Sequence, residues 1–264
     1  MLSHFREIAD QGAGVLLITH DLELALKTAD KIVVFYAGTA VEEADTVDFN
    51  REAALRHPYT RALFRAMPEH GFAPEPGIQP YVRDLPEGCP YGPRCPKYKT
   101  ECSKEVSYVP YQGGLVRCIC PGDENEILPG ILSGPAGLKG QMTSEQITSE
   151  QMASGQRSGE YNAWGKEGVK LMRLEAKDLS FRYHKGNRQI LNHVSVSLDS
   201  SDRLGLAAPS GFGKTTFCKI LAGYEQPDEG QVLLDGKPLS EYKGYCPVQL
   251  IWQHPQEQSI PDER

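Results

Sequence analysis

The stretch Ala208-Pro209-Ser210-Gly211-Phe212-Gly213-Lys214-Thr215-Thr216 decides how the rest of the chain is interpreted. It follows an apolar run at residues 204–207 that predicts a buried strand, and it precedes a helical pattern at residues 217–222. A glycine-rich loop in this context is typical of phosphate binding, because main-chain N–H groups and the helix dipole converge on one point. In such a loop Lys214 reaches the β- and γ-phosphates, and the Thr215 hydroxyl binds Mg²⁺.

The loop departs from the G-x-x-x-x-G-K-[ST] pattern at one position, because Ala208 stands where the first glycine is expected. Alanine can often adopt the backbone conformation of that entry position, so the phosphate-binding interpretation is kept. The alternative is a glycine-rich turn that merely ends a strand. The residues expected to surround the phosphates are Ser210, Gly211, Phe212, Gly213, Lys214, Thr215 and Thr216.

Length and composition limit the classes of protein to consider. The chain has 264 residues, enough for one large or two medium domains. Its formal net charge is -7 and its basic residues are scattered, which argues against a nucleic-acid partner. No apolar run approaches the roughly 20 residues that cross a bilayer, and the N-terminus is not a signal peptide. We therefore expect a cytosolic chain, whose seven cysteines are metal ligands or buried thiols rather than disulfides.

The pattern of residues 14–41 predicts part of an α/β sheet. Residues 14–19 are short and continuously apolar, as in a strand buried on both faces, and His20 follows at its carboxyl end. Asp21 can cap a helix over residues 22–29, and a second strand is expected at residues 31–35, followed by a short edge strand through Val41. A single histidine after a strand is usually structural, so His20 alone does not establish a site.

Residues 51–121 form a region of different character. A short helix is expected at residues 53–55 and another after Pro58, ending near Met67, and a proline-rich stretch follows. Five cysteines lie in or after this stretch, spaced C-x5-C-x6-C-x15-C-x-C, namely Cys89, Cys95, Cys102, Cys118 and Cys120. Because the segment has little apolar material of its own, a bound metal is expected to replace a missing core. Zinc and an iron–sulfur cluster both use four thiolates, and the absence of closely spaced ligand pairs favours iron–sulfur; free thiols on a loop are the alternative.

Two arginines, Arg94 and Arg117, each precede one of these cysteines. A neighbouring guanidinium stabilises a thiolate, so we expect these arginines to lower the pKa of the thiols.

The C-terminal part follows a stretch with the composition of a tether. Residues 122–170 are rich in Gly, Ser, Gln and Met and cannot bury enough apolar surface to offset their ordering entropy. Strands are then expected at residues 174–183 and 190–198, and Asp235-Gly236 predicts a hairpin turn. Tyr183 ends the first of these strands, and its spacing alone does not distinguish a core from a surface role.

Several segments resemble ATP-binding cassette (ABC) ATPases. Residues 15–22, Val-Leu-Leu-Ile-Thr-His-Asp-Leu, are similar to the His-switch segment of that family, and residues 248–255 resemble the strand that ends in its Q-loop. The resemblance implies that His20 contacts the γ-phosphate and helps to order the attacking water. It also implies that Gln253 touches Mg²⁺ and that water, that Tyr183 stacks on adenine, and that ATP is held between two such domains.

The cysteine region resembles the C-terminal extension of ABC ATPases that serve oligopeptide, dipeptide and nickel importers, where His-Pro-Tyr-Thr and cysteines of this spacing recur. That resemblance implies a [4Fe-4S] cluster ligated by Cys89, Cys95, Cys102 and Cys118, with Cys120 as the spare or as a replacement for Cys118. It further implies partnership with transmembrane permease subunits, a peripheral place at the inner face of the cell membrane, and peptides or nickel as cargo.

The order of the motifs suggests parts of two domains. The expected fold class is α/β. The chain is expected to contain partial P-loop NTPase domains of the ABC type, with a cysteine-rich irregular segment between them. Residues 1–50 resemble the end of a first domain, 51–121 the extension, 122–170 a linker and 171–264 the start of a second domain. Neither the Leu-Ser-Gly-Gly-Gln signature nor an apolar strand ending in Asp-Glu is found in the sequence, so this chain is expected to bind ATP weakly and to hydrolyse it negligibly.

Three alternatives stay open. The His-switch half and the phosphate-loop half can pack on each other as a permuted domain, since they carry complementary parts. The chain can be a metal or iron–sulfur module with vestigial nucleotide-binding segments. It can also be a different P-loop enzyme, such as a small-molecule kinase.

Overall fold

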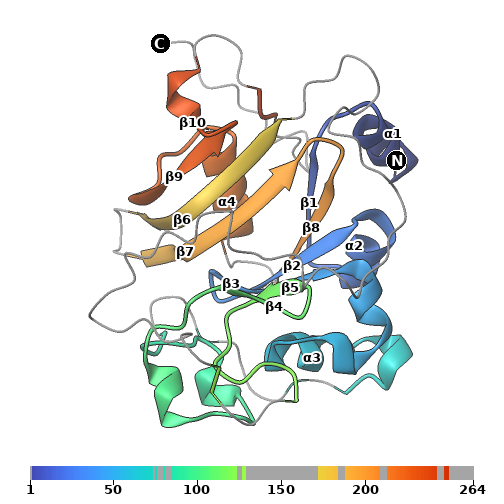
Figure 1. The fold of residues 1–264 in the computed structure, drawn as a ribbon, viewed down its shortest axis with the longest axis vertical. Helices are drawn as coiled ribbons and strands as arrows, with labels where there is room; N and C mark the ends of the chain where they lie inside the picture. Colours follow the sequence, from blue (N-terminus) through green and yellow to red (C-terminus); the bar gives the residue numbers. More distant parts are fainter. Residues whose placement is uncertain are drawn as a thin grey trace, which may run out of the picture.

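The fold is described from a computed structural model, which covers residues 2–73, 75, 80, 85–123, 127–128, 172–183, 188–208, 213–242 and 247–249. Its helices are α1 (Leu2–Asp10), α2 (Leu22–Thr28), α3 (Pro58–Arg65) and α4 (Lys214–Leu221) (Figure 1). Its strands are β1 (Val15–Thr19), β2 (Lys31–Tyr36), β3 (Thr39–Asp45), β4 (Val109–Tyr111), β5 (Gly114–Val116), β6 (Arg173–Tyr183), β7 (Arg188–Asp199), β8 (Arg203–Ala207), β9 (Glu229–Leu234) and β10 (Lys237–Pro238). In these ranges, every helix is too short or too polar to cross a membrane.

The larger sheet combines strands from both ends of the chain. Its order is β1-β8-β2-β3-β5-β4, and β8 runs parallel to both of its neighbours (Figure 1). Leu204 of β8 is paired with Leu16 on one side and with Lys31 on the other. The strand that leads into the glycine-rich loop therefore lies between two strands of the N-terminal segment, so the two halves share one sheet.

A glycine in β8 allows α2 to approach this sheet closely. A Cβ atom added at Gly205 would lie 2.7 Å from Cδ1 of Ile32 and 3.3 Å from the Cβ atoms of Ala25 and Ala29. Because these partners belong to α2, β2 and the turn between them, any larger side chain in the middle of β8 would push the two halves apart.

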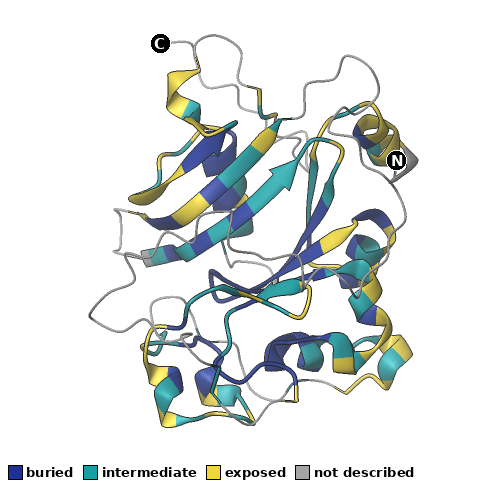
Figure 2. Ribbon diagram, in the orientation of Figure 1, coloured by how far each residue is buried: buried dark blue, intermediate teal, exposed yellow. Residues whose placement is uncertain are grey.

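The second sheet is antiparallel and has the order β10-β9-β6-β7. A hydrophobic core lies between it, α4 and the larger sheet, and contains residues from both halves of the chain. Phe35 of β2 and Phe217 of α4 meet there, with ring centroids 5.8 Å apart. Buried residues run along β2 and along the facing strands (Figure 2). The core thus joins the halves on the face of the sheet opposite the cysteine region.

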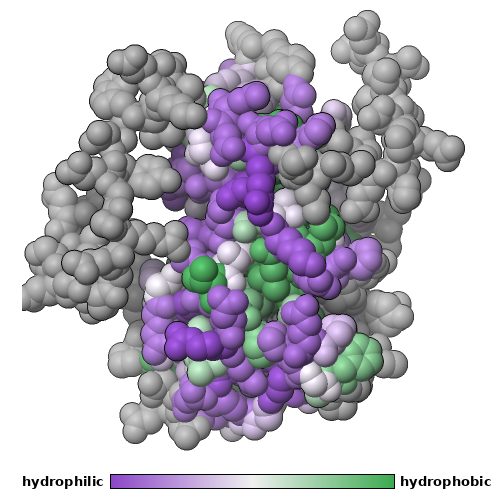
Figure 3. Space-filling model, turned by 90° about the vertical axis from the view of Figure 1, so that its right-hand side faces the viewer, coloured by the Kyte–Doolittle hydropathy of each residue, from purple (hydrophilic) through white to green (hydrophobic). Residues whose placement is uncertain are grey.

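The strand β1 forms an edge of the larger sheet in the described chain. Residues 15–18 are only half-buried although they are apolar. The side of the molecule that carries α1 and β1 shows a band of hydrophobic residues between hydrophilic areas (Figure 3).

The cysteine region is better packed than its sequence predicted. β4 and β5 attach it to the larger sheet through β3, and Cys89, Cys102 and Cys120 lie inside a hydrophobic cluster. Many of the apolar partners come from α2, β2 and β3, which lie outside residues 51–121. Buried thiols pack in this cluster as small apolar side chains do.

Most of the predicted elements are confirmed, including β1, α2, β2, the β6–β7 pair and the hairpin turn, where Asp235 and Gly236 both have positive φ. The helix expected at residues 53–55 is a single 3-10 turn, Glu52–Ala54, and β3 extends well beyond Val41. Of the strand expected before Gln253, only residues 248–249 are described, and these are not in a strand. Most of residues 122–170 lie outside the described residues.

Candidate nucleotide and metal sites

The described part of the glycine-rich loop has the geometry expected at the start of a helix. Gly213 precedes α4 with φ 84°, and a Cβ there would lie 2.8 Å from the carbonyl oxygen of Ile190, so only glycine fits. Ala208 has no positive φ, so alanine stands at the first position of the pattern without backbone strain. Ser210, Gly211 and Phe212 lie outside the described residues.

Lys214 is the first residue of α4. Its Nζ donates a 2.5 Å hydrogen bond to the carbonyl oxygen of Ala208, which places the amino group beside the end of β8. Burial lowers the pKa of Lys214. A cation held at this point is available to phosphate oxygens that approach the loop.

The two threonines after Lys214 differ in exposure. Thr215 is exposed, whereas Thr216 is buried and its Oγ1 lies 3.3 Å from the hydroxyl of Tyr183. The Tyr183 ring packs edge-to-face on Phe181, with centroids 4.9 Å apart, and remains 38% exposed. The structure therefore brings Tyr183 next to the loop helix and leaves part of its ring open to a planar partner.

His20 reaches the same edge of the sheet as the loop. Thr19 and Ala207 are paired at the ends of β1 and β8, and the Ala208 amide donates to the Thr19 carbonyl at 3.4 Å. His20 follows directly and is exposed, while Asp21 caps α2 by accepting a hydrogen bond from the Leu24 amide. His20 and the loop thus lie at adjacent strand ends, although the sequence separates them widely. Gln253 lies outside the described residues.

All five cysteines of the region line one pocket beneath β2 and β3. Its walls are formed by His57, Pro58, Cys89, Gly92, Cys95, Lys97, Cys102, Val106, Cys118, Ile119 and Cys120, around a cavity of about 10 Å³. Short turns position the cysteines: the Cys89 amide donates to the Cys102 carbonyl at 2.8 Å, and the Lys99 amide donates to the Cys102 sulfur at 3.4 Å. Cys89, Cys95, Cys102 and Cys118 form no disulfides.

The electrostatics of this pocket differ from the prediction. Burial raises the pKa of Cys89 to about 12 and also raises the pKa values of Cys95, Cys102 and Cys118. The expectation that Arg94 and Arg117 lower these pKa values was wrong, because both guanidinium groups bind elsewhere. Arg94 donates to the Tyr36 hydroxyl and the Glu75 carbonyl, and Arg117 donates to the carbonyl oxygens of Ala40, Val106 and His193.

The donor set suits a metal, but the thiols of the described residues are not arranged as a finished ligand group. Across the described ranges, no three His, Cys, Asp or Glu side chains converge closely enough to hold an ion. The cysteines nevertheless surround one small cavity, whose size is close to that of a single water molecule. Changes of side-chain rotamer are therefore needed before four thiolates can share one metal centre.

A buried carboxylate, Glu42, positions the backbone at this pocket, and the sequence reading did not single it out. Its side chain is fully buried and accepts hydrogen bonds from the Arg56 amide at 2.8 Å and from the His57 amide at 2.7 Å. The Arg56 guanidinium lies 3.3 Å from the same carboxylate and 2.9 Å from Asp48. Burial raises the pKa of Glu42, and these donors act against that shift. β3 also contains Glu43 and Asp45, so the sequence did not distinguish Glu42 as the buried carboxylate.

His57 caps α3 and faces the pocket. Its Nδ1 accepts a 3.0 Å hydrogen bond from the Tyr59 amide, and Pro58 at the first helical position has no N–H to satisfy. Burial lowers the pKa of His57 to about 3. Its Nε2 is buried and has no hydrogen-bond partner in the described part of the chain, which costs roughly 1–3 kcal/mol for such a group.

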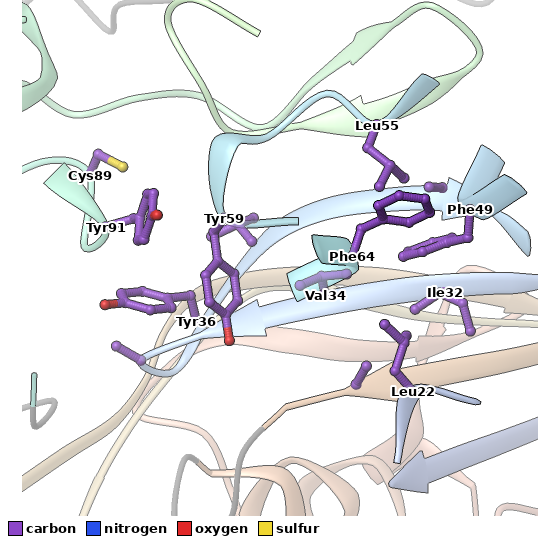
Figure 4. Packing of buried hydrophobic residues seen from close by; sticks show 14 of the residues in the cluster. Leu22, Ile32, Val34, Tyr36, Phe49, Leu55, Tyr59, Phe64, Cys89 and Tyr91 are labelled. Carbon is purple, nitrogen blue, oxygen red and sulfur yellow. The ribbon is translucent and has the colours of Figure 1, made fainter. Parts of the chain in front are cut away.

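Three tyrosines belong to the same hydrophobic cluster as Cys89. The rings of Tyr36, Tyr59 and Tyr91 lie with centroids 4.5–5.4 Å apart and gather beside Cys89 (Figure 4). Tyr91 donates a 2.6 Å hydrogen bond to Glu75. These aromatic rings make the environment of Cys89 apolar.

Comparison with known protein families identifies both halves. The ABC transporter family model matches residues 191–260, which include the loop and the region of Gln253. The model of the oligopeptide/dipeptide transporter C-terminal region matches residues 41–102, which include Glu42, His57 and the first three cysteines.

Similar proteins agree with these matches. The oligopeptide transport ATP-binding protein OppD of Mycobacterium tuberculosis is 30% identical over 227 residues, covering 84% of this chain and 35% of the relative. The dipeptide transport ATP-binding protein DppD of Escherichia coli is 43% identical over 100 residues, covering 36% and 30%. The peptide transport system ATP-binding protein SapD of Salmonella typhimurium is 44% identical over 96 residues, covering 33% and 28%. The chain spans about a third of the length of these relatives. It belongs to the family of ABC transporter ATP-binding proteins that carry the oligopeptide/dipeptide transporter C-terminal region.

Proposed function

We propose that the chain binds Mg·ATP at a site built from both of its ends and acts as an ATP-binding part of a peptide importer. The observation that supports this most is the place of β8 between β1 and β2. That pairing puts His20 and the glycine-rich loop at the carboxyl ends of neighbouring parallel strands, where open α/β sheets bind their ligands.

Each residue of the proposed site has a physical role. Main-chain N–H groups of residues 210–216 surround the phosphates, and Lys214 neutralises their charge. The exposed Thr215 hydroxyl and Gln253 bind Mg²⁺, while His20 contacts the γ-phosphate and orients the attacking water. The exposed part of the Tyr183 ring supports the adenine. Catalysis at such a site comes from positioning and from electrostatic stabilisation of an in-line attack.

The arrangement of motifs supports a fused parent architecture. The match to the Mycobacterium tuberculosis OppD covers 84% of this chain, so it includes residues from both halves within one stretch of that relative. We therefore assign residues 1–50 and 51–121 to the end of one nucleotide-binding domain and its extension, 122–170 to a linker, and 171–264 to the start of a second domain. In this chain the two partial domains complete one sheet.

The proposed partners follow from the family. Relatives are named as ATP-binding proteins of oligopeptide and dipeptide transport, which supports transmembrane permease subunits and a second nucleotide-binding domain as partners. The proposed location is the cytoplasmic face of the membrane. Peptides are the favoured cargo, and nickel is the alternative that the sequence resemblance introduced.

We further propose a metal centre at the cysteine pocket, ligated by Cys89, Cys95, Cys102 and either Cys118 or Cys120. The shared pocket and the unpartnered Nε2 of His57 support this assignment. A [4Fe-4S] cluster is favoured by the ligand spacing, and zinc is the alternative. When bound, the metal crosslinks the turns of the extension and replaces protons on the buried thiols.

Titration calorimetry with Mg²⁺ and a non-hydrolysable ATP analogue tests the nucleotide site. We expect one site per wild-type chain, loss of binding in Lys214→Ala, and unchanged binding in the control Lys237→Ala, which removes an exposed lysine on β10. Binding that is absent from the wild type, or equal in Lys214→Ala, contradicts the proposal. With ATP itself, we expect turnover far below the typical ~10 s⁻¹ of enzymes.

Elemental analysis of anaerobically purified protein tests the metal centre. Iron with sulfide and an absorbance band near ~400 nm identifies a cluster, and zinc at one atom per chain identifies a structural site. Either metal should be lost on Cys95→Ser and retained on Cys218→Ser, which changes a cysteine on α4 outside the pocket. Wild-type protein that contains neither iron with sulfide nor zinc contradicts the assignment.

A further inference from the structure

His57 lines the cysteine pocket, and one of its two ring nitrogens keeps unused hydrogen-bonding capacity in the described part of the chain. The Glu42 carboxylate binds the His57 amide at 2.7 Å, and the Tyr59 amide donates to Nδ1 at 3.0 Å. The side chain is 1% exposed, and the pocket that it lines contains all five cysteines of the region. Within the described residues, Nε2 has no hydrogen-bond partner.

These contacts determine the tautomer. A neutral imidazole carries its single proton on one nitrogen, and Nδ1 uses its lone pair to accept the Tyr59 N–H. The proton is therefore on Nε2, which is a buried donor without an acceptor in the described chain. A nitrogen that carries a proton has no lone pair for a metal ion, so this arrangement disfavours ligation by His57.

We propose that His57 Nε2–H donates a hydrogen bond to a metal-bound cysteine thiolate and is thus a positioning residue of the metal centre. The proposal rests on the cysteine metal centre proposed above. A thiolate is a far better acceptor than a neutral thiol, because a hydrogen bond to an ionised group is charge-assisted. The orphaned donor therefore gains its partner only when metal binding deprotonates the cysteines.

The chemical consequence is control of the charge on sulfur. Four thiolates around one divalent ion leave a net negative charge in a pocket whose other lining groups are mostly apolar, with Lys97 as the one cation among the described lining residues. An N–H···S hydrogen bond withdraws charge from the ligand and orients it, and such outer contacts are typically worth 10–100-fold in metal affinity. The His-Pro-Tyr sequence thus has one physical purpose at each position: pocket donor, helix start without an N–H, and amide that sets the tautomer.

Titration of the full-length chain with Co²⁺ under anaerobic conditions tests the proposal, since Co²⁺ reports both thiolate and nitrogen ligands in its spectrum. The variant is His57→Asn, because asparagine retains an acceptor at the start of α3 but has no group at the position of Nε2. The control is His193→Asn on β7, where φ is 49° and asparagine is well tolerated.

We expect His57→Asn to bind Co²⁺ about 10–100-fold more weakly than the wild type. The sulfur-to-cobalt band should move to lower energy, while the d–d bands remain those of four-sulfur ligation, and the control should behave as the wild type. If His57→Asn binds Co²⁺ as tightly as the wild type, the proposed role of His57 is overturned, but the metal centre is not. A d–d spectrum that changes from mixed nitrogen–sulfur to sulfur ligation shows that His57 is a ligand and also overturns it. Failure of the wild type to bind Co²⁺, together with metal-free protein in the elemental analysis described above, overturns the metal centre itself.

A measurement on unmutated protein covers the case in which the variant does not fold. In wild-type chain labelled with ¹⁵N-histidine, the His57 resonances should be those of a neutral ring protonated at Nε2, with and without metal. A ring protonated at Nδ1 contradicts the proposal.

Discussion

Asp30 and Arg203 lie 173 positions apart in the sequence and form a two-pronged ion pair at the start of β8. The Arg203 Nη2 donates to Oδ1 at 2.6 Å and Nε donates to Oδ2 at 3.0 Å. The main chains also meet, because the Asp30 amide donates to the Arg203 carbonyl at 2.7 Å. This contact joins the turn before β2 to the strand that leads into the glycine-rich loop, so it reports directly on the union of the two halves.

A double-mutant cycle with Asp30→Ala and Arg203→Ala should detect this pair. The pair is partly exposed, so we expect a coupling free energy of only about 0.5–1 kcal/mol in urea unfolding, at the upper end for surface pairs because the geometry is bidentate. The coupling should shrink in high salt. Strictly additive effects of the two substitutions at low salt would show that these side chains do not meet.

The contact between Gly205 and Ile32 provides a second test from packing rather than charge. Gly205→Ala should destabilise the fold by about 1–3 kcal/mol, because the new methyl group meets Cδ1 of Ile32 at 2.7 Å. Ile32→Val removes that atom and alone costs about 0.5–1.5 kcal/mol. The double variant should lose less unfolding free energy than the two single variants lose together, as measured by chemical unfolding. Fully additive losses would show that Gly205 does not lie next to Ile32.

Glu42 is expected to be the most sensitive charged position of the extension. Glu42→Ala leaves the buried Arg56 guanidinium and two main-chain amides without their shared acceptor, and we expect a loss of about 3–5 kcal/mol in unfolding free energy. The matched control is Glu52→Ala, because Glu52 pairs with Arg65 at 3.6 Å and both side chains are partly exposed; this substitution should cost below about 1 kcal/mol. Similar costs for the two variants would contradict the buried carboxylate network.

The amount that the sequence reveals differs between local and long-range features. The strand before His20, the Asp21 cap and the turn at Asp235-Gly236 follow from residues that are neighbours in the chain, so their patterns predicted them. The insertion of β8 between β1 and β2 depends on contacts across more than half of the chain, and complementarity of the two halves was its only sign.

The candidate sites divide in the same way. Lys214 and Thr215 stand in a motif with a known spacing, and the structure places them at a helix start as expected. The position of His57 relative to the cysteines, and the role of Glu42, depend on how β3 and α3 fold over the pocket. The raised thiol pKa values could not be predicted either, since they follow from burial in a cluster to which α2, β2 and β3 contribute, and Arg94 and Arg117 bind elsewhere.

Cys218 on α4 gives a prediction for the dependence on pH. Burial raises the pKa of this thiol to about 12 from an ordinary value of 9.0. Only the thiolate reacts with iodoacetamide, so in native protein the alkylation rate should still rise steeply with pH between 9 and 10, whereas in urea it should pass its midpoint near 9.0 and flatten above that. Peptide mass spectrometry after short labelling pulses measures both rates. A native rate with its midpoint near pH 9 would mean that the thiol is not buried.

Amide hydrogen exchange along β8 decides whether the two ends of the chain share one sheet. In the 264-residue chain we expect residues 204–207 to exchange slowly together with β1 and β2, because β8 is hydrogen-bonded on both sides. Leu17→Pro, which breaks β1, should speed exchange in β8 more than in the distant β9. If residues 204–207 exchange as fast as an unstructured peptide while β2 stays protected, the halves do not join and the proposed nucleotide site is not formed within one chain.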